Sequence, residues 1–95
     1  MKHPKIDRVR HLPLEPSEYC DRWVIRDPAR NYRKMCIHAI AEVTGLSPHT
    51  IKDWGKNFHR RPKYVTRLLR YADILNQFQQ QVKDGTIRIP DDFPT

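Results

Sequence analysis

Basic side chains that can bind phosphate are concentrated in one stretch of the chain. The sequence of 95 residues carries 18 Lys and Arg against 11 Asp and Glu, which gives a net charge of +7. Residues 52–70 hold seven Lys and Arg and one Asp, so they contribute +6 to that surplus. A surplus of this size favours a polyanionic partner, and its concentration favours a single contact surface.

Part of this charge is expected to form a stripe on a helix. At about 100° per residue, Lys63, Arg67 and Arg70 fall within about 60° of one another on a helix that Pro62 opens. Such a stripe could lie along a phosphate backbone, cover part of its own fold, or bind RNA. The residues expected to contact phosphate in this region are His59, Arg60, Arg61, Lys63, Arg67 and Arg70.

Residue patterns that support catalysis or metal binding are absent from the sequence. There is no Gly-rich phosphate loop or nucleophile elbow, and spacing joins no pair of acidic residues. Cys20 and Cys36 form no CxxC pair, and Cys36 and His38 would point to different sides of one helix. We therefore expect no enzyme activity, no cofactor and no metal site.

Composition also suggests where the protein works. Two cysteines are too few for a disulfide framework, so two reduced thiols are expected. No apolar run approaches the roughly 18 residues of a membrane span, and the N-terminus lacks the apolar block of a signal peptide. These patterns predict a cytoplasmic protein with no membrane contact and no small-molecule substrate.

The periodicity predicts an all-α fold, a small bundle of four to five helices over residues 17–83. Residues 1–16, with three prolines, are expected to form a basic extended arm that either enters a DNA groove or docks on the surface. Ser17 is expected to cap a first helix, and Asp27 with Pro28 is expected to open a second helix that runs to about Thr44, either unbroken or with a break near residue 33. Residues 84–95 are expected to be an extended tail.

A helix-turn-helix is predicted at residues 37–56. Gly45 can end the first helix in the left-handed conformation, while Ser47 caps the second helix and Pro48 takes its first position. Ala41 is small enough for the second helix to cross close to it. The core of the motif is expected to comprise Ile40, Ala41, Gly45, Leu46, Ile51 and Trp54.

This segment resembles the helix-turn-helix of the phage lambda repressor and Cro family, which often reads small residue, glycine, Leu-Ser, Thr-Ile and Trp in this order. The similarity extends over roughly residues 36–75, because Pro62 opens a helix bearing a Leu-Leu pair, as in the family. One departure is at the entry to the first motif helix, where Arg33, Lys34 and Met35 stand without a cap.

The resemblance implies a small, sequence-specific transcriptional regulator that places the helix 47–56 in the major groove of double-stranded DNA. Lys52 could then donate to guanine O6 and N7, and Asp53 could accept from cytosine N4. An ordinary solvated helix face is the alternative for these charges. The expected base contacts are His49, Lys52, Asp53 and Lys56, and Ser47 and Thr50 are expected to cap the helix or contact phosphate.

The long helix 62–83 carries an apolar face broader than an ordinary surface helix needs. Its apolar residues span about 180°, against roughly 100° for a typical surface helix. The excess could pack on the helix around Trp23 or on a second copy of the chain, through the face of residues 64–82. Two other functions stay open, a protein interaction module and a DNA-binding accessory subunit of a larger nucleic-acid enzyme.

Overall fold

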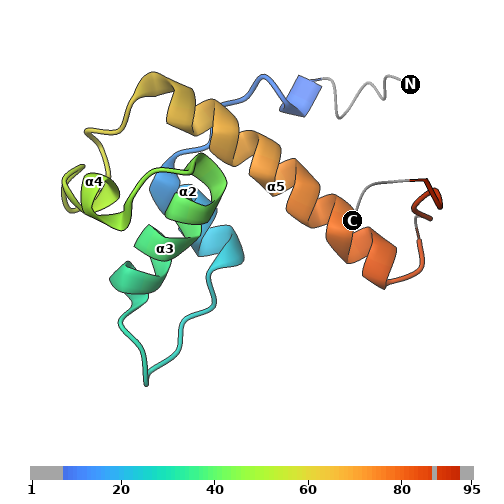
Figure 1. Cartoon of the computed structure of the whole chain (residues 1–95), viewed down its shortest axis with the longest axis horizontal. Coiled ribbons are helices and arrows are strands. Elements are labelled where there is room, and N and C mark those ends of the chain that lie inside the picture. The colour runs from blue at the N-terminus through green and yellow to red at the C-terminus, as the bar shows by residue number, and fades with distance from the viewer. Residues whose placement is uncertain (1–7, 87, 93–95) are drawn as a thin grey trace.

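A computed structural model describes residues 8–86 and 88–92 of the chain. Within these residues the structure has four helices and no strand, which confirms the all-α prediction (Figure 1). None of these helices is long and apolar enough to cross a membrane. The helices are α2 (Pro16–Trp23), α3 (Tyr32–Thr44), α4 (Pro48–Lys52) and α5 (Lys63–Lys83).

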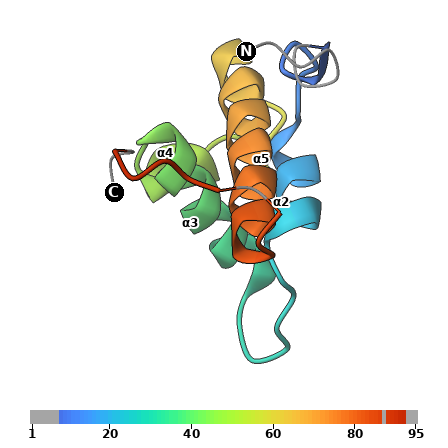
Figure 2. The ribbon, with the colours of Figure 1, turned by 90° about the vertical axis from the view of Figure 1, so that its right-hand side faces the viewer.

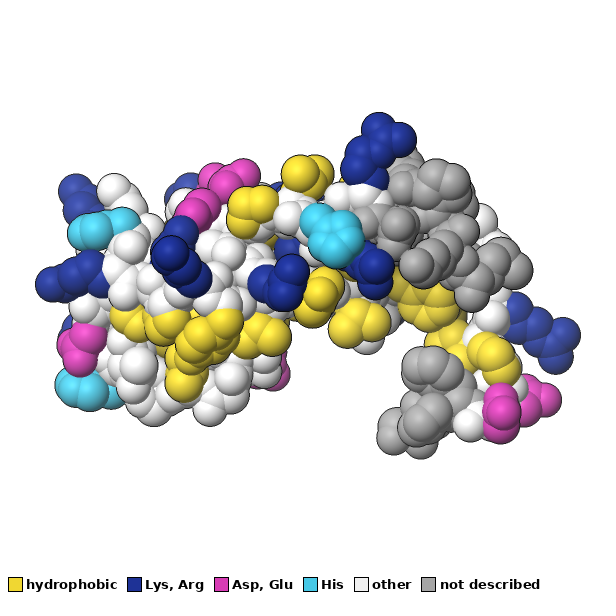
Figure 3. Space-filling view, turned by 90° about the horizontal axis from the view of Figure 1, so that it is seen from above, with side chains coloured by type: hydrophobic (Ala, Val, Ile, Leu, Met, Phe, Trp, Pro, Cys, Tyr) yellow, Lys and Arg dark blue, Asp and Glu magenta, His cyan; other side chains and the backbone are white. Residues whose placement is uncertain are grey.

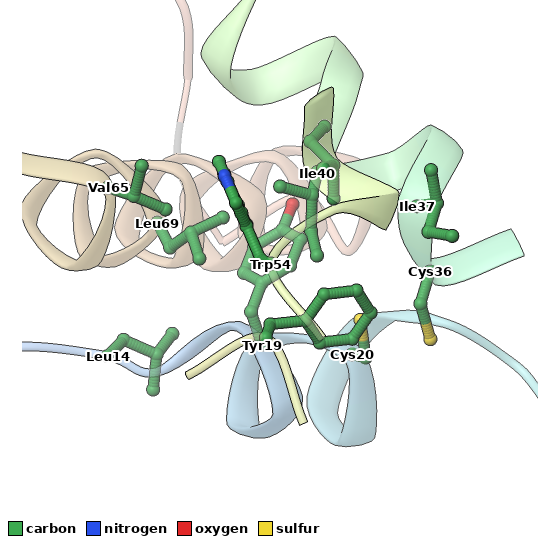
Figure 4. Packing of buried hydrophobic residues seen from close by; sticks show 11 residues of the cluster. Leu14, Tyr19, Cys20, Cys36, Ile37, Ile40, Trp54, Val65 and Leu69 are labelled. Atoms are coloured by element: carbon green, nitrogen blue, oxygen red, sulfur yellow. The ribbon is translucent and has the colours of Figure 1, made fainter. Parts of the chain in front are cut away.

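The helix α5 is the central element of the fold. It packs against both α2 and α3, and Figure 2 shows α2 on one side of it and α3 with α4 on the other. The core lies at this junction, with apolar side chains meeting from all four helices and the connecting segments (Figure 4). The buried apolar residues are Leu14, Tyr19, Cys20, Cys36, Ile37, Ile40, Ile51, Trp54, Phe58, Val65 and Leu69.

The first helix begins earlier than predicted. Its N-cap is Glu15 rather than Ser17, and Pro16 occupies its first turn, where a missing N–H costs nothing. The Glu18 carboxylate accepts a hydrogen bond from the Glu15 N–H at 3.3 Å, as in a capping box. The side chain of Glu15 is held by Arg61, 46 residues away, and no local pattern signals that contact.

The second helix begins later than predicted. Asp27 accepts from the Ala29 N–H at 2.9 Å and forms a local turn instead of opening a helix. The cap is Asn31, whose side chain accepts from the Lys34 N–H at 3.0 Å. The prediction of a helix from Pro28 is therefore wrong, and so is the prediction of an uncapped entry to the motif.

The corner of the motif forms as predicted, but its second helix is short. Gly45 adopts a left-handed φ of 76° at the end of α3, and Ser47 caps α4 by accepting from the Thr50 N–H. The expected helix 47–56 stops at Lys52. Beyond it the chain turns so that Trp54 enters the core, and Gly55 takes a φ of 94°.

The arm is docked rather than extended over its described part. Residues 8–12 form a helical turn, and the Leu14 N–H donates to the Thr66 carbonyl of α5 at 3.2 Å. Leu14 is 2% exposed, so it is a core residue, whereas Leu12 is 51% exposed. Residues 1–7 of the arm and residues 87 and 93–95 of the tail lie outside the described residues, and the described parts of the tail, 84–86 and 88–92, are exposed.

Candidate nucleic-acid interface

The corner between α3 and α4 is joined by apolar side chains. Ile40 from α3 and Ile51 from α4 are fully buried, and Trp54 is 5% exposed. Ala41 and Leu46 are partly buried and pack on the same cluster. Five of the six predicted core residues therefore pack together, whereas Gly45 is exposed and serves only as the corner. These apolar contacts hold α4 against α3.

The opposite face of α4 is polar and exposed. His49, Lys52 and Asp53 are spaced three and four apart, so they lie on one side of the helical turn and away from Ile51. His49 Nε2 lies 3.7 Å from Asp53 Oδ2, and both side chains are largely exposed. A contact between such exposed groups contributes little to stability. This face can therefore meet a partner without disturbing the fold.

An arginine holds the segment that follows α4. The Arg33 guanidinium donates to the carbonyl oxygens of Lys56 at 2.7 Å and Gly55 at 2.9 Å. It also lies 4.8 Å from the ring centroid of Phe58, which is buried and has a left-handed φ of 58°. These contacts position exposed Lys56 beside α4, in a turn rather than on the helix. No local pattern in the sequence indicates the Arg33 contact, although Phe58 is a lone aromatic residue within a basic run.

A basic groove of about 340 Å³ separates the start of α3 from α4. Lys34 and His38 line it from α3, one helical turn apart, and Lys52 and His49 line it from α4. Lys34 and His38 are exposed and were not among the predicted contacts. Together with the polar face of α4 they extend the basic surface across both helices of the motif.

Further basic groups follow α4 along the chain. His59, Arg60, Lys63 and Arg67 are exposed. A Cβ atom built on Gly55 would lie 3.1 Å from His59 and 3.4 Å from Arg60, so both side chains rest against this glycine. In Figure 3, Lys, Arg and His side chains lie on the end of the molecule that holds α4 and also further along the same face, with a few acidic side chains among them. The acidic side chains of the tail lie at the opposite end.

Two of the predicted phosphate contacts are used within the fold instead. Arg61 makes a two-pronged contact with the Glu15 carboxylate at 2.7 and 3.1 Å. Hydrogen bonding to Arg61 lowers the pKa of Glu15, although partial burial opposes the shift. Arg70 donates to the Leu12 carbonyl and to Asp73, and its side chain is only 14% exposed. The predicted stripe therefore loses Arg70, and Lys63 and Arg67 remain.

Asp73 is a fully buried carboxylate with a complete set of donors. Its Oδ1 accepts from Arg22 at 2.7 Å and from the Trp23 indole at 2.8 Å, and its Oδ2 accepts from Arg70 at 2.8 Å. Burial alone would raise the pKa of Asp73, but the hydrogen bonds from Trp23 and Arg22 outweigh it and lower the pKa below 3.8. The carboxylate joins α2 to α5 and takes no part in the exposed basic surface.

The two cysteines are both buried, and no disulfide joins them. Burial raises the pKa of the Cys20 thiol, and the neighbouring Cys36 adds to the shift. Among the residues that the structure describes, no group of three or more His, Cys, Asp or Glu could hold a metal ion.

Comparisons with protein-family models, curated proteins and solved structures found no match to this chain. The resemblance to the lambda repressor and Cro family thus stays a prediction from the sequence. Any assignment of function has to depend on the geometry of α3, α4 and their basic surroundings.

Proposed function

We propose that the protein binds double-stranded DNA in a sequence-specific manner, with α4 in the major groove, as a small transcriptional regulator. One observation carries the proposal. The exposed face of α4 presents a histidine, a lysine and an aspartate, while the fold itself uses only the apolar face of that helix. Polar side chains left free on a rigidly docked helix are what direct readout of base edges requires.

Lys52 and Asp53 would carry most of the base readout. Lys52 can donate to guanine O6 and N7, whereas Asp53 can accept from the amino group of cytosine. His49 can contact a base edge or a phosphate from the start of the helix. Because α4 has only five residues, Lys56 would reach DNA from the turn that Arg33 holds and not from the helix.

The surrounding basic groups would bind the phosphate backbone. Arg60, Lys63 and Arg67 lie after α4, and Lys34 and His38 line the groove beside it. His59 and the hydroxyl groups of Ser47 and Thr50 are exposed and can add contacts. Such contacts supply affinity that falls as salt rises, and they carry no sequence information themselves.

The proposal is tested by selecting bound duplexes from a random library at moderate salt. We expect an enriched motif for the wild-type protein. Lys52→Ala should relax preference at one base pair by about tenfold and leave other positions unchanged. Arg67→Ala should weaken binding to all duplexes and reduce the dependence of affinity on salt by about one phosphate contact.

Two results would contradict the proposal. Recovery of no motif would exclude sequence-specific regulation. Equal losses on every sequence from both variants would remove Lys52 from base readout. Circular dichroism of each variant provides the control for folding, and because Lys52 and Arg67 are exposed, both variants should fold as the wild type does.

A further inference from the structure

The helix α5 carries an apolar stripe that the described part of the chain leaves largely uncovered. The stripe residues recur at alternating intervals of four and three and fall within about 80° at 100° per residue. The buried residues of α5 centre on the other side of the helix, around Leu69 and Asp73. We call this set the α5 stripe, and it consists of Tyr64, Leu68, Tyr71, Leu75, Phe78 and Val82.

The broad apolar face that the sequence predicts for this helix is partly buried and partly exposed in the structure. Val65 and Leu69 enter the core, whereas Leu75 is 59% exposed, Tyr64 52% and Tyr71 40%. In Figure 1 the C-terminal half of α5 extends past α2 and α3, so the bundle ends before the stripe does. An open groove of about 710 Å³ runs beside it, with walls from α2, α3 and α5.

The spacing of the residues in the α5 stripe indicates which kind of element can pack on it. Apolar residues that alternate at intervals of three and four form the a and d positions of a heptad, and these side chains interlock with another helix that lies nearly parallel to their own. The stripe runs for most of the 21 residues of α5. A second helix of similar length is therefore the matching partner.

The charge of the stripe's surroundings favours a second copy of the same chain. Residues 74–82 contain no charged side chain, although the protein as a whole has a net charge of +7. This half of the stripe therefore presents no like charge to an identical copy. The N-terminal half of α5 carries exposed Lys63 and Arg67, so a parallel pair would place Arg67 close to its own copy, whereas an antiparallel pair would place it beside the uncharged half.

We propose that two copies of the protein associate through antiparallel packing of their α5 stripes. The two-fold axis passes between Tyr71 and Leu75, so that Tyr71 of each copy packs on Leu75 of the other. Leu68 then meets Phe78, and Tyr64 meets Val82. The proposal does not depend on DNA binding, and it can hold or fail separately. If both proposals hold, the protein reads two half-sites related by the same axis.

Sedimentation velocity over about a hundredfold range of protein concentration, without DNA, tests the association. We expect a concentration-dependent dimer for the wild type and a dissociation constant at least about tenfold higher for Leu75→Glu. Leu75 is exposed, so this variant should keep its fold. Gln80→Glu adds the same charge to the face of α5 turned away from the stripe, and it should dimerise as the wild type does.

A monomer at every wild-type concentration would overturn the proposal, and so would a Leu75→Glu dimer as stable as the wild-type one. Mixing variants tests the orientation. In an antiparallel pair Leu75→Glu faces Tyr71→Lys, so this mixture should form a heterodimer. A mixture of Leu75→Glu with Leu75→Lys should not. Heterodimers in the second mixture alone would overturn the antiparallel arrangement.

Discussion

The contact between α2 and α5 and the contact between α3 and α4 are held by different kinds of interaction. Asp73 joins α2 to α5 through buried, charged hydrogen bonds to Arg22 and Trp23. Apolar side chains such as Ile40 and Ile51 join α3 to α4. Polar side chains therefore take part in the contact between α2 and α5, whereas apolar side chains make the contact between α3 and α4. His49, Lys52 and Asp53 are exposed and are not part of the apolar contact between α3 and α4.

The largest expected effect is a difference in stability between variants of two aspartates, Asp73 in α5 and Asp53 beside α4. Asp73→Asn should lower the free energy of unfolding by about 3 kcal/mol, because Arg22, Arg70 and the Trp23 indole lose a buried charged acceptor. The matched change Asp53→Asn on exposed α4 should alter it by less than about 0.5 kcal/mol. Denaturant unfolding followed by tryptophan fluorescence measures both, and equal losses would contradict the distinction.

A smaller effect is expected at Arg33, a charged group that contacts the turn after α4. Arg33→Met should cost about 2 kcal/mol, because the hydrogen bonds to the carbonyls of Gly55 and Lys56 are lost. Hydrogen exchange of the amides in residues 54–60 should become faster. Arg30→Met, at a side chain that is 72% exposed, is the control and should change neither quantity. Unchanged exchange in the Arg33 variant would show that the apolar core alone holds this turn.

The smallest effect is a difference in pH dependence. The pKa of Asp73 is lowered on folding, so its contribution to stability is complete above its unfolded value of about 3.8 and is lost as the pH falls through the lower folded value. Wild-type stability should therefore fall more steeply than that of Asp73→Asn as the pH is lowered below about 4. If the stabilities of the wild type and of Asp73→Asn fall equally with pH, the acid sensitivity belongs to other groups, such as Glu15.

Local chemistry in the sequence predicts much of the motif but little of its surroundings. Gly45, Ser47 and Pro48 act on adjacent residues, so their roles in the corner follow from the sequence. Asp27 and Asn31 are both able to cap a helix, and the local sequence does not decide between them. Asp73 looks like an ordinary polar residue of a helix, and no local pattern indicates its partners Trp23 and Arg22, which lie 50 and 51 residues away.

The candidate site, too, follows from the local sequence only in part. The exposed positions of His49, Lys52 and Asp53 follow from helical spacing opposite Ile51. The roles of Arg61 and Arg70 do not, because a basic residue in a basic run gives no sign of a distant carboxylate or carbonyl. The turn that follows α4 likewise contacts Arg33, which lies 22 residues before Gly55 and donates to its carbonyl.

The distant partners of Asp73 also bear on how the chain folds. Contacts of Arg33 with the turn after α4 close loops of 22 and 23 residues, whereas the contacts of Asp73 with α2 close loops of 50 and 51. Longer loops lose more chain entropy on closure, and contacts between distant residues slow folding. We expect α3 and α4 to form early in the folding reaction and the docking of α2 on α5 to complete it.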